Sequence, residues 1–189
     1  LKFSDNSKLN IGDSNDIQIY HDGSDTYMQN STGDIYMTNT GRSIYTTSSL
    51  SKFTTDTFLI ESVNSTDPLV QIKNTTNDAN GARLQFIKDK GAAGADGDDI
   101  GIIEFVSDDA AQTQTTFAKV LVEVGEADDT DEAGKLSLQV ASSDGTTTGL
   151  TDGLILTGHK TSDYVDVTIG GGSSSTVTIP GDADIDGTL

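Results

Sequence analysis

The residues of this sequence that could do chemistry begin with a histidine and an aspartate side by side, His21 and Asp22, in the stretch IQIYHDGSDTYMQ at residues 17–29. An imidazole next to a carboxylate can form part of a catalytic triad, and a histidine can also bind a metal ion. The only other histidine is His159, in a polar loop, and no G-x-S-x-G nucleophile elbow accompanies either one. We therefore interpret His21 as the polar end of a strand and Asp22-Gly23 as a turn, and we expect no catalytic residue here.

A second candidate is a run of alternating aspartates near residue 189, which matches the opening D-x-D-x-D-G of a calcium-binding loop. Carboxylates at alternate positions can converge on one hard cation, and the glycine permits a sharp turn. The glutamate that completes such a loop would lie past the last residue of this sequence. The same letters also describe an ordinary turn with solvated carboxylates. We therefore expect no cofactor, and the alternative is calcium with the candidate ligands Asp182, Asp184 and Asp186.

Two further acidic clusters lie in the expected connections 91–99 and 125–134. Such clusters can bind a metal ion, although Asp and Glu are mostly solvated at loop tips. Connections often carry recognition while strands carry packing. We therefore predict that these loops, together with the connection 107–116, form receptor contacts. The candidate residues are Asp96, Asp98, Asp99, Asp128, Asp129 and Asp131.

The charge balance and the residue types argue against several classes of function. Thirty Asp and Glu against eleven Lys and Arg give a net charge of −19 with no basic segment, so nucleic acids and anionic membrane surfaces would be repelled. No apolar stretch approaches the roughly 18 residues of a membrane span. The absence of cysteine excludes a thiol nucleophile. Glycosidases need two carboxylates across a cleft, but thirty acidic residues supply such pairs by chance, and we predict that the chain is not an enzyme.

The low apolar content indicates that the chain needs copies of itself. Only 33% of the residues are hydrophobic and 6% aromatic, against about 45–50% apolar residues in typical globular domains. A single chain of this composition would struggle to offset the entropy lost on ordering. We infer a β-rich chain, because Ser, Thr, Asn, Asp and Gly favour short strands and turns. Surface buried between copies would complete its core.

The first fifty residues repeat short apolar triplets at intervals of eight or nine residues, separated by turns rich in Asn, Asp, Gly and Ser. A unit this short cannot bury its own apolar face, so stacking must bury it. Two packings satisfy the pattern: a single-chain solenoid or meander, and a trimeric shaft resembling a β-helix or prism. The low apolar content favours the trimer. The triplets are LKF at 1, LNI at 9, IQI at 17, TYM at 26, IYM at 35 and IYT at 44.

We therefore expect an all-β chain with three parts: a short-strand shaft over 1–52, an antiparallel, sandwich-like module over 53–158, and a short-strand connector over 159–189 that leads to a further domain. Period-two alternation of apolar and polar residues is typical of half-buried antiparallel strands. Val120, Val122 and Val124 share one face with Ala118, as Leu136, Leu138 and Val140 do in the next strand. The predicted strands are 68–74, 82–88, 100–106, 117–124, 135–142, 163–172 and 175–182.

Most of the chain resembles a known family. The stretch LKFSDNSKLNIGDSNDIQIYHDGSDTYMQNSTGDIYM is similar to repeats in tail fibres of cyanobacterial viruses and other structural proteins of marine bacteriophages, where an IYHDG pattern recurs. The segments PLVQIKNTTNDANGARLQFIKDKGAAGADGDDIGIIEF, FAKVLVEV and GKLSLQVAS look like the β-module that follows these repeats, and VDVTIG and GDADIDGTL resemble the short elements after it. The resemblance implies an elongated, homotrimeric appendage of the virion, without catalytic residues.

The function predicted from these features is structural and adhesive. The chain would form part of a phage tail fibre that supports adsorption to the host cell. Its partners would be its own copies, other virion tail proteins and a host surface receptor, for which a glycan is one candidate. Two alternatives are a polysaccharide-degrading tailspike segment and a capsid or tail decoration protein.

Overall fold

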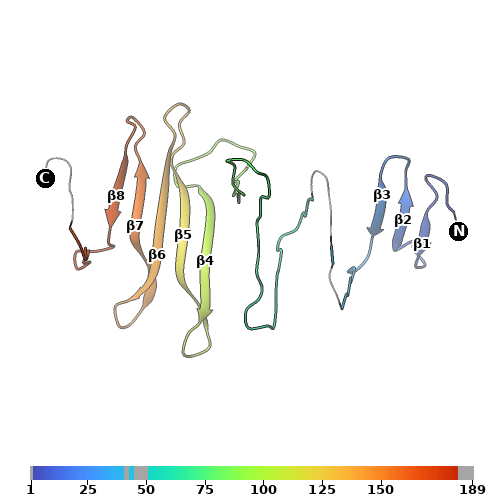
Figure 1. Ribbon diagram of the computed structural model, residues 1–189, viewed down its shortest axis with the longest axis horizontal. Coiled ribbons are helices and arrows are strands. Elements are labelled where there is room, and N and C mark those ends of the chain that lie inside the picture. Colours follow the sequence, from blue (N-terminus) through green and yellow to red (C-terminus); the bar gives the residue numbers. More distant parts are fainter. Residues whose placement is uncertain (1, 41–42, 45–50, 183–189) are drawn as a thin grey trace. The chain divides into compact units, whose positions relative to one another are not determined.

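The computed structural model describes residues 2–40, 43–44 and 51–182. Within these ranges every regular element is a β-strand and there is no helix, which confirms the all-β prediction (Figure 1). The chain divides into two units, Leu1–Pro68 and Leu69–Leu189. Each unit contains one antiparallel sheet, of three and of five strands.

The first sheet consists of β1 (Leu9–Ile11), β2 (Ile17–His21) and β3 (Thr26–Asn30), paired in chain order. These strands coincide with the predicted triplets LNI, IQI and TYM. Two turns with left-handed glycines connect them, Gly12 with φ of 91° and Gly23 with φ of 103°. Only glycine adopts such angles at low cost, so the glycines determine where the chain reverses.

The other triplets do not continue this sheet within the described residues. The structure has no strand at LKF or at IYM, and most of IYT lies outside the described residues. A strand exists only where a neighbour accepts and donates its backbone hydrogen bonds, and the described part of the chain offers these triplets no such neighbour. The strand predictions at LKF and IYM are therefore wrong for this chain by itself, and the repeat shaft stays a prediction.

The second sheet is an open meander of long strands in which each strand pairs antiparallel with the next along the chain (Figure 1). It confirms the strands predicted around 100–106, 117–124 and 135–142, and part of 163–172. The strands are β4 (Asp99–Asp108), β5 (Gln114–Glu126), β6 (Ala133–Ser143), β7 (Thr148–Gly158) and β8 (Val165–Ile169).

Three predicted strands, 68–74, 82–88 and 175–182, have no strand pairing in the described part of the chain. Residues with alternating apolar side chains therefore remain exposed. The side chains of Leu69 and Ile87 are 70% and 73% exposed, respectively. The prediction of strands here is wrong for the single chain, because alternation indicates a half-buried strand only when a partner strand and a covering layer are present. The second layer of a sandwich is likewise not formed within the described residues.

No hydrophobic side chain is buried anywhere in the described ranges; the two buried residues there are Glu126 and Ser137. The described residues thus form well-paired sheets but contain no hydrophobic core of the kind that normally stabilises them.

Candidate interaction surfaces

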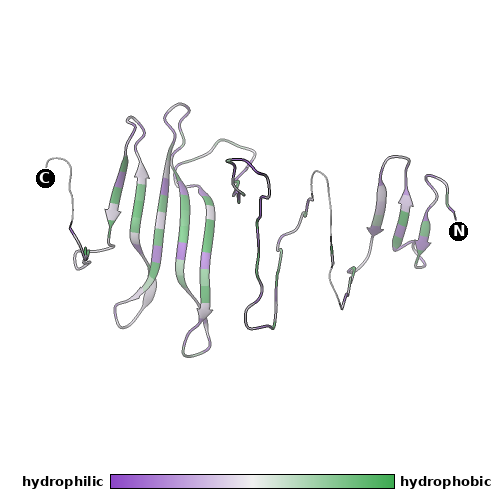
Figure 2. Ribbon diagram, viewed as in Figure 1, coloured by the Kyte–Doolittle hydropathy of each residue, from purple (hydrophilic) through white to green (hydrophobic). Residues whose placement is uncertain are grey.

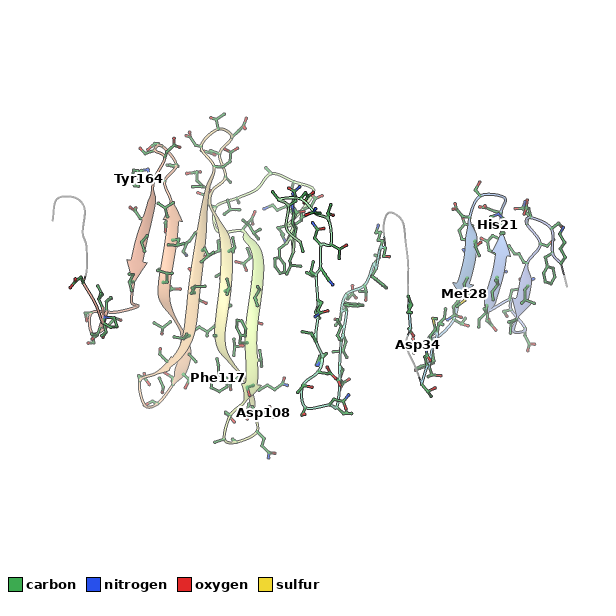
Figure 3. The ribbon with its side chains drawn as sticks, viewed as in Figure 1. His21, Met28, Asp34, Asp108, Phe117 and Tyr164 are labelled. Carbon is green, nitrogen blue, oxygen red and sulfur yellow. The ribbon has the colours of Figure 1, made fainter. Side chains whose placement is uncertain are left out.

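His21, which is labelled in Figure 3, and Asp22 both stabilise the turn between β2 and β3. The Nδ1 of His21 donates to the backbone carbonyl of Asp25 at 2.8 Å. One carboxylate oxygen of Asp22 accepts from the backbone N–H groups of Ser24 and Asp25, each at 2.9 Å. These N–H donors, that of Asp25 foremost, hold the pKa of Asp22 below its ordinary value, because they stabilise the ionised form. The imidazole and the carboxylate thus both form hydrogen bonds with the backbone of the turn, which supports the interpretation of His21 and Asp22 as residues that stabilise a turn.

The same hairpin carries an aromatic pair on its surface. The rings of Tyr20 and Tyr27 are cross-strand partners and stack with their centroids 4.8 Å apart and their planes inclined by 14°. The ammonium of Lys8 lies 4.5 Å from the centroid of Tyr20 and donates to the side chain of Gln18 at 2.9 Å. Stacked aromatic pairs and cation–π contacts add stability beyond area burial. Tyr20 and Tyr27 therefore connect β2 with β3.

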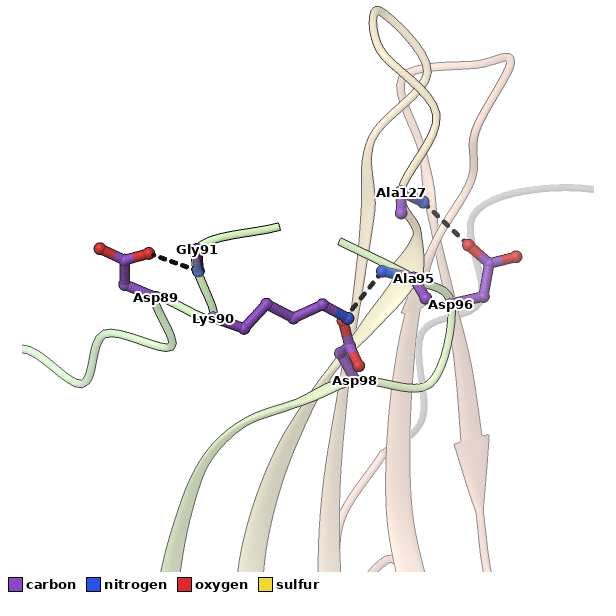
Figure 4. A network of polar contacts seen from close by, with 7 residues as sticks. All are labelled: Asp89, Lys90, Gly91, Ala95, Asp96, Asp98 and Ala127. Carbon is purple, nitrogen blue, oxygen red and sulfur yellow. Dashed lines mark hydrogen bonds and ion pairs between the residues drawn. The ribbon is translucent and has the colours of Figure 1, made fainter. Parts of the chain in front are cut away.

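Asp96 and Asp98, two of the predicted receptor contacts, both accept hydrogen bonds in and around the loop 91–98 (Figure 4). The carboxylate of Asp96 accepts from the backbone N–H of Ala127 at 2.9 Å. One oxygen of Asp98 accepts from Lys90 Nζ at 2.6 Å and from the backbone N–H of Ala95 at 2.9 Å. The Lys90 ammonium, and after it the Ala95 N–H, lower the pKa of Asp98. Asp99, the third member of this cluster, is exposed as the first residue of β4.

The second acidic loop, 127–132, keeps its carboxylates free for contact. Asp128, Asp129 and Asp131 are exposed. Their loop is closed by a backbone hydrogen bond from the N–H of Asp131 to the carbonyl of Asp128. None of these three carboxylates accepts a hydrogen bond within the described residues. Of the predicted receptor contacts, these three are therefore the better placed to meet a partner.

Sequence reasoning missed the ion pair at the base of this loop. Glu126 ends β5 with only 11% of its side chain exposed, and Lys160 Nζ donates to its Oε2 at 2.7 Å. Lys160 belongs to the connection between β7 and β8, as does His159, whose ring stacks on Tyr164 with centroids 4.4 Å apart. The ammonium lowers the pKa of Glu126, and the carboxylate raises the pKa of Lys160. The only signal in the sequence was that Lys160 is the one basic residue after 150.

Only one of the three calcium candidates lies within the described residues. Asp182 is exposed, whereas Asp184 and Asp186 lie outside the described residues. In the part of the chain that the structure describes, no three His, Asp or Glu side chains come together as a metal site. Among the same residues there is no helix long and apolar enough to cross a membrane.

The main surface feature of the five-stranded sheet is a face that is apolar across all five strands. Along its middle runs a row of directly paired residues, one per strand: Ile103, Val120, Leu138, Leu154 and Ile169. We call this face the apolar sheet face. The strand register places on it Ile103, Phe105, Ala118, Val120, Val122, Leu136, Leu138, Val140, Leu154, Leu156, Val165, Val167 and Ile169.

The opposite face, which we call the polar sheet face, carries the charged side chains of the strands. Lys135 Nζ donates to Glu123 Oε2 at 2.9 Å, and the side-chain amide of Gln139 donates to Asp152 at 2.9 Å. Figure 2 shows the resulting alternation of apolar and polar residues along the strands. Ser137 lies in a central row of this face between the partners Leu121 and Ile155 and is 1% exposed.

The side chain of Phe86, from the extended segment 82–88, covers part of the apolar sheet face. It lies against Gly101 of β4, where a Cβ would come within 3.0 Å of the Cβ of Phe86. It also lines an apolar hollow with Ile103 and Val120. The absence of a side chain at Gly101 thus lets Phe86 approach the sheet, although Phe86 itself remains 48% exposed.

Comparison of the chain with protein-family models, with curated proteins and with solved structures found no match. The fold and these surfaces therefore describe the chain only by its class: it is an all-β chain of two open antiparallel sheets, with acidic loops and an exposed apolar face.

Proposed function

We propose that this chain is a structural segment of a bacteriophage tail fibre, located on the virion, which supports adsorption to the host cell as a homotrimer. The observation that carries the proposal is the combination of ordered antiparallel sheets with no buried hydrophobic side chain in the described residues. An enzyme that acts as a single chain needs a rigid core to position its groups, whereas a fibre segment completes its core between chains.

Two further features support the assignment. The IYHDG element of the resemblance is a tight hairpin turn with a stacked tyrosine pair, a unit suited to repetition along a fibre. The acidic loop 127–132 presents exposed carboxylates beyond the ends of long strands. In this proposal the shaft holds weak receptor sites away from the particle, and several copies together provide avidity. Other tail proteins would hold the fibre on the virion.

The assignment is tested by imaging. Gold-labelled antibodies raised against this chain, applied to intact phage particles that encode it, are expected to decorate appendages in electron micrographs. Antibody to an unrelated virion protein serves as the control. Label confined to the capsid or the tail tube would indicate that the chain is a decoration protein and not part of a fibre. Unlabelled particles would overturn the assignment to the virion.

The trimer is tested separately by sedimentation equilibrium. The expected mass is three times 19.8 kDa and independent of dilution over the micromolar range. A stable monomer would contradict both the trimer and the need for a shared core.

A further inference from the structure

We propose that the apolar sheet face of β4–β8 is the surface through which copies of this chain pack on one another. The same residues of neighbouring copies would then form the hydrophobic core that the described part of the single chain lacks. This inference rests on one part of the proposed function, the self-association of the chain. It does not depend on where in a virion the chain lies.

The continuity of the face is the first argument. The row Ile103–Val120–Leu138–Leu154–Ile169 joins five strands by direct pairing, and a second row joins Val122, Leu136, Leu156 and Val167. Several of these side chains are far from buried: Leu138 is 39% exposed and Val167 58%. Contiguous apolar surface of this kind marks an interaction site in a folded protein. Scattered exposed hydrophobic residues would carry no such meaning.

The amount of uncovered surface is the second argument. Seven of the thirteen side chains on the apolar sheet face are at least 39% exposed, and the other six are only half-buried. A standard interface buries about 800 Å² on each partner, and obligate oligomers bury considerably more, with interfaces that resemble a domain core cut in half. An apolar face that extends over five strands and is this open suits an obligate assembly.

The charge distribution makes this face the place where copies of the chain can meet. A net charge of −19 opposes self-association over most of the surface, since like charges repel. The apolar sheet face contains no charged side chain, because the charged residues of these strands lie on the polar sheet face or at the strand ends. Copies therefore meet there with the least repulsion and the largest apolar gain. A cationic partner would instead be drawn to the acidic loops.

The other face of the sheet is unsuited to this role. Packing it against a copy would desolvate the Lys135–Glu123 ion pair and the Gln139–Asp152 hydrogen bond, and buried ion pairs often cost more in desolvation than they return. The inference therefore predicts a one-sided assembly, with the apolar sheet face inside and the polar sheet face in water.

Two adjacent residues of β8 provide a matched test. Val167 lies on the apolar sheet face and Thr168 on the polar sheet face, and both are exposed in the single chain. Because the chain contains no cysteine, Val167→Cys and Thr168→Cys each introduce a single thiol. In the assembled protein we expect a soluble maleimide to label Val167→Cys at least about tenfold more slowly than Thr168→Cys, since a covered thiol reacts only when the interface opens. In denaturant the two rates should become equal.

The outcomes separate this inference from the proposed function. Light scattering on the same samples reports whether the variants are assembled, and circular dichroism reports whether they keep their strands. Equal labelling of the two thiols in an assembled, folded protein would overturn the inference, as would a folded monomer. Neither result affects the imaging of intact particles, which tests the fibre assignment separately. Conversely, unlabelled particles would overturn the location on the virion but not the inference that copies pack through the apolar sheet face.

Discussion

The ammonium of Lys160 lies 2.7 Å from a carboxylate oxygen of Glu126, although 34 residues separate them in the chain. Glu126 ends β5, and Lys160 lies in the connection from β7 to β8. The pair therefore fastens the end of one long strand to a connection two strands away. Since Glu126 is one of only two buried residues in the described ranges, this contact is one of the few where loss of a partner would leave a charge poorly solvated.

The variant Lys160→Met should lower the Tm of the protein by several degrees. It keeps much of the apolar stem but leaves the carboxylate of Glu126 without its cation. Thermal unfolding followed by circular dichroism measures the effect. The matched control is Lys73→Met, because the exposed Lys73 has no ion pair in the described structure. Equal Tm values for the two variants would show that the pair contributes nothing, and the double variant Glu126→Gln/Lys160→Met should recover part of the loss.

Stability should fall at acid pH through the carboxylates whose pKa values folding lowers. The pKa of Glu126 lies below 4.5 and those of Asp98 and Asp22 lie below 3.8, the ordinary values for Glu and Asp. A group with a lowered pKa contributes stability above its unfolded value, and the contribution is lost as pH falls through the folded value. We expect a Tm that is nearly constant from pH 7 to about 5 and that falls below about pH 4.5. Lys160→Met should reduce this fall.

Stability should also fall at alkaline pH, through the lysines whose pKa values folding raises. Folding raises the pKa values of Lys135 and Lys160 above 10.5, chiefly through hydrogen bonds to Glu123 and Glu126. Their contribution is complete below pH 10.5 and is lost as pH rises through the higher folded values. A Tm that stayed constant through both the acid and the alkaline ranges would contradict the ion pairs.

Replacing Ser137 by alanine should stabilise the sheet. The hydroxyl of Ser137 is buried and has no hydrogen-bond partner among the described residues. An unsatisfied buried polar group costs about 1–3 kcal/mol, so its removal should raise the free energy of unfolding by about 1 kcal/mol, as measured by urea denaturation. The control is Ser142→Ala in the same strand, whose hydroxyl is hydrogen-bonded to that of Thr151 and whose loss should not stabilise. A destabilised Ser137→Ala protein would contradict the argument.

The carboxylate of Asp22 should slow hydrogen exchange of the backbone N–H groups in the turn of the IYHDG element. In Asp22→Ala the backbone N–H groups of Ser24 and Asp25 lose their acceptor, and their hydrogen exchange with solvent, followed by NMR, should accelerate by about tenfold or more. Asp25→Ala is the matched control, because its backbone can still make the same contacts. Unchanged exchange in Asp22→Ala would show that the turn forms without its carboxylate.

The exposed acidic loop should contribute to adsorption if it contacts a receptor. The triple variant Asp128→Asn, Asp129→Asn and Asp131→Asn should weaken binding of the assembled protein to host cells without changing the Tm. Neutralising Asp5, Asp13 and Asp56, exposed residues of the first unit, provides the same change of charge elsewhere. Equal binding by both triple variants would place recognition outside this loop. Asp96 and Asp98 are unsuitable for this test because their hydrogen bonds to Ala127, and to Lys90 and Ala95, hold the loop 91–98 in place.

Local features of the sequence predicted most strands of the two sheets, although β7 was not among the predicted strands. Alternation in KLSLQVAS and FAKVLVEV indicated β6 and β5, and Asp22-Gly23 marked the turn after β2. These features are readable because side-chain direction in a strand alternates residue by residue, and because a left-handed turn needs particular residues. For the same reason His21 could be interpreted as part of a turn without any structure.

The β class, the alternation of the long strands and the acidic, cysteine-free surface could all be predicted from the sequence, since each depends only on composition or on neighbours along the chain. Which alternating segments pair with a neighbour became clear only from the fold: β4–β8 pair, whereas 68–74 and 82–88 do not within the described chain. The fold also joins Glu126 to Lys160 and aligns thirteen apolar side chains on one face. Both results depend on strand register, which is a property of pairs of strands, and a shift of one residue would turn every side chain of a strand to the other face.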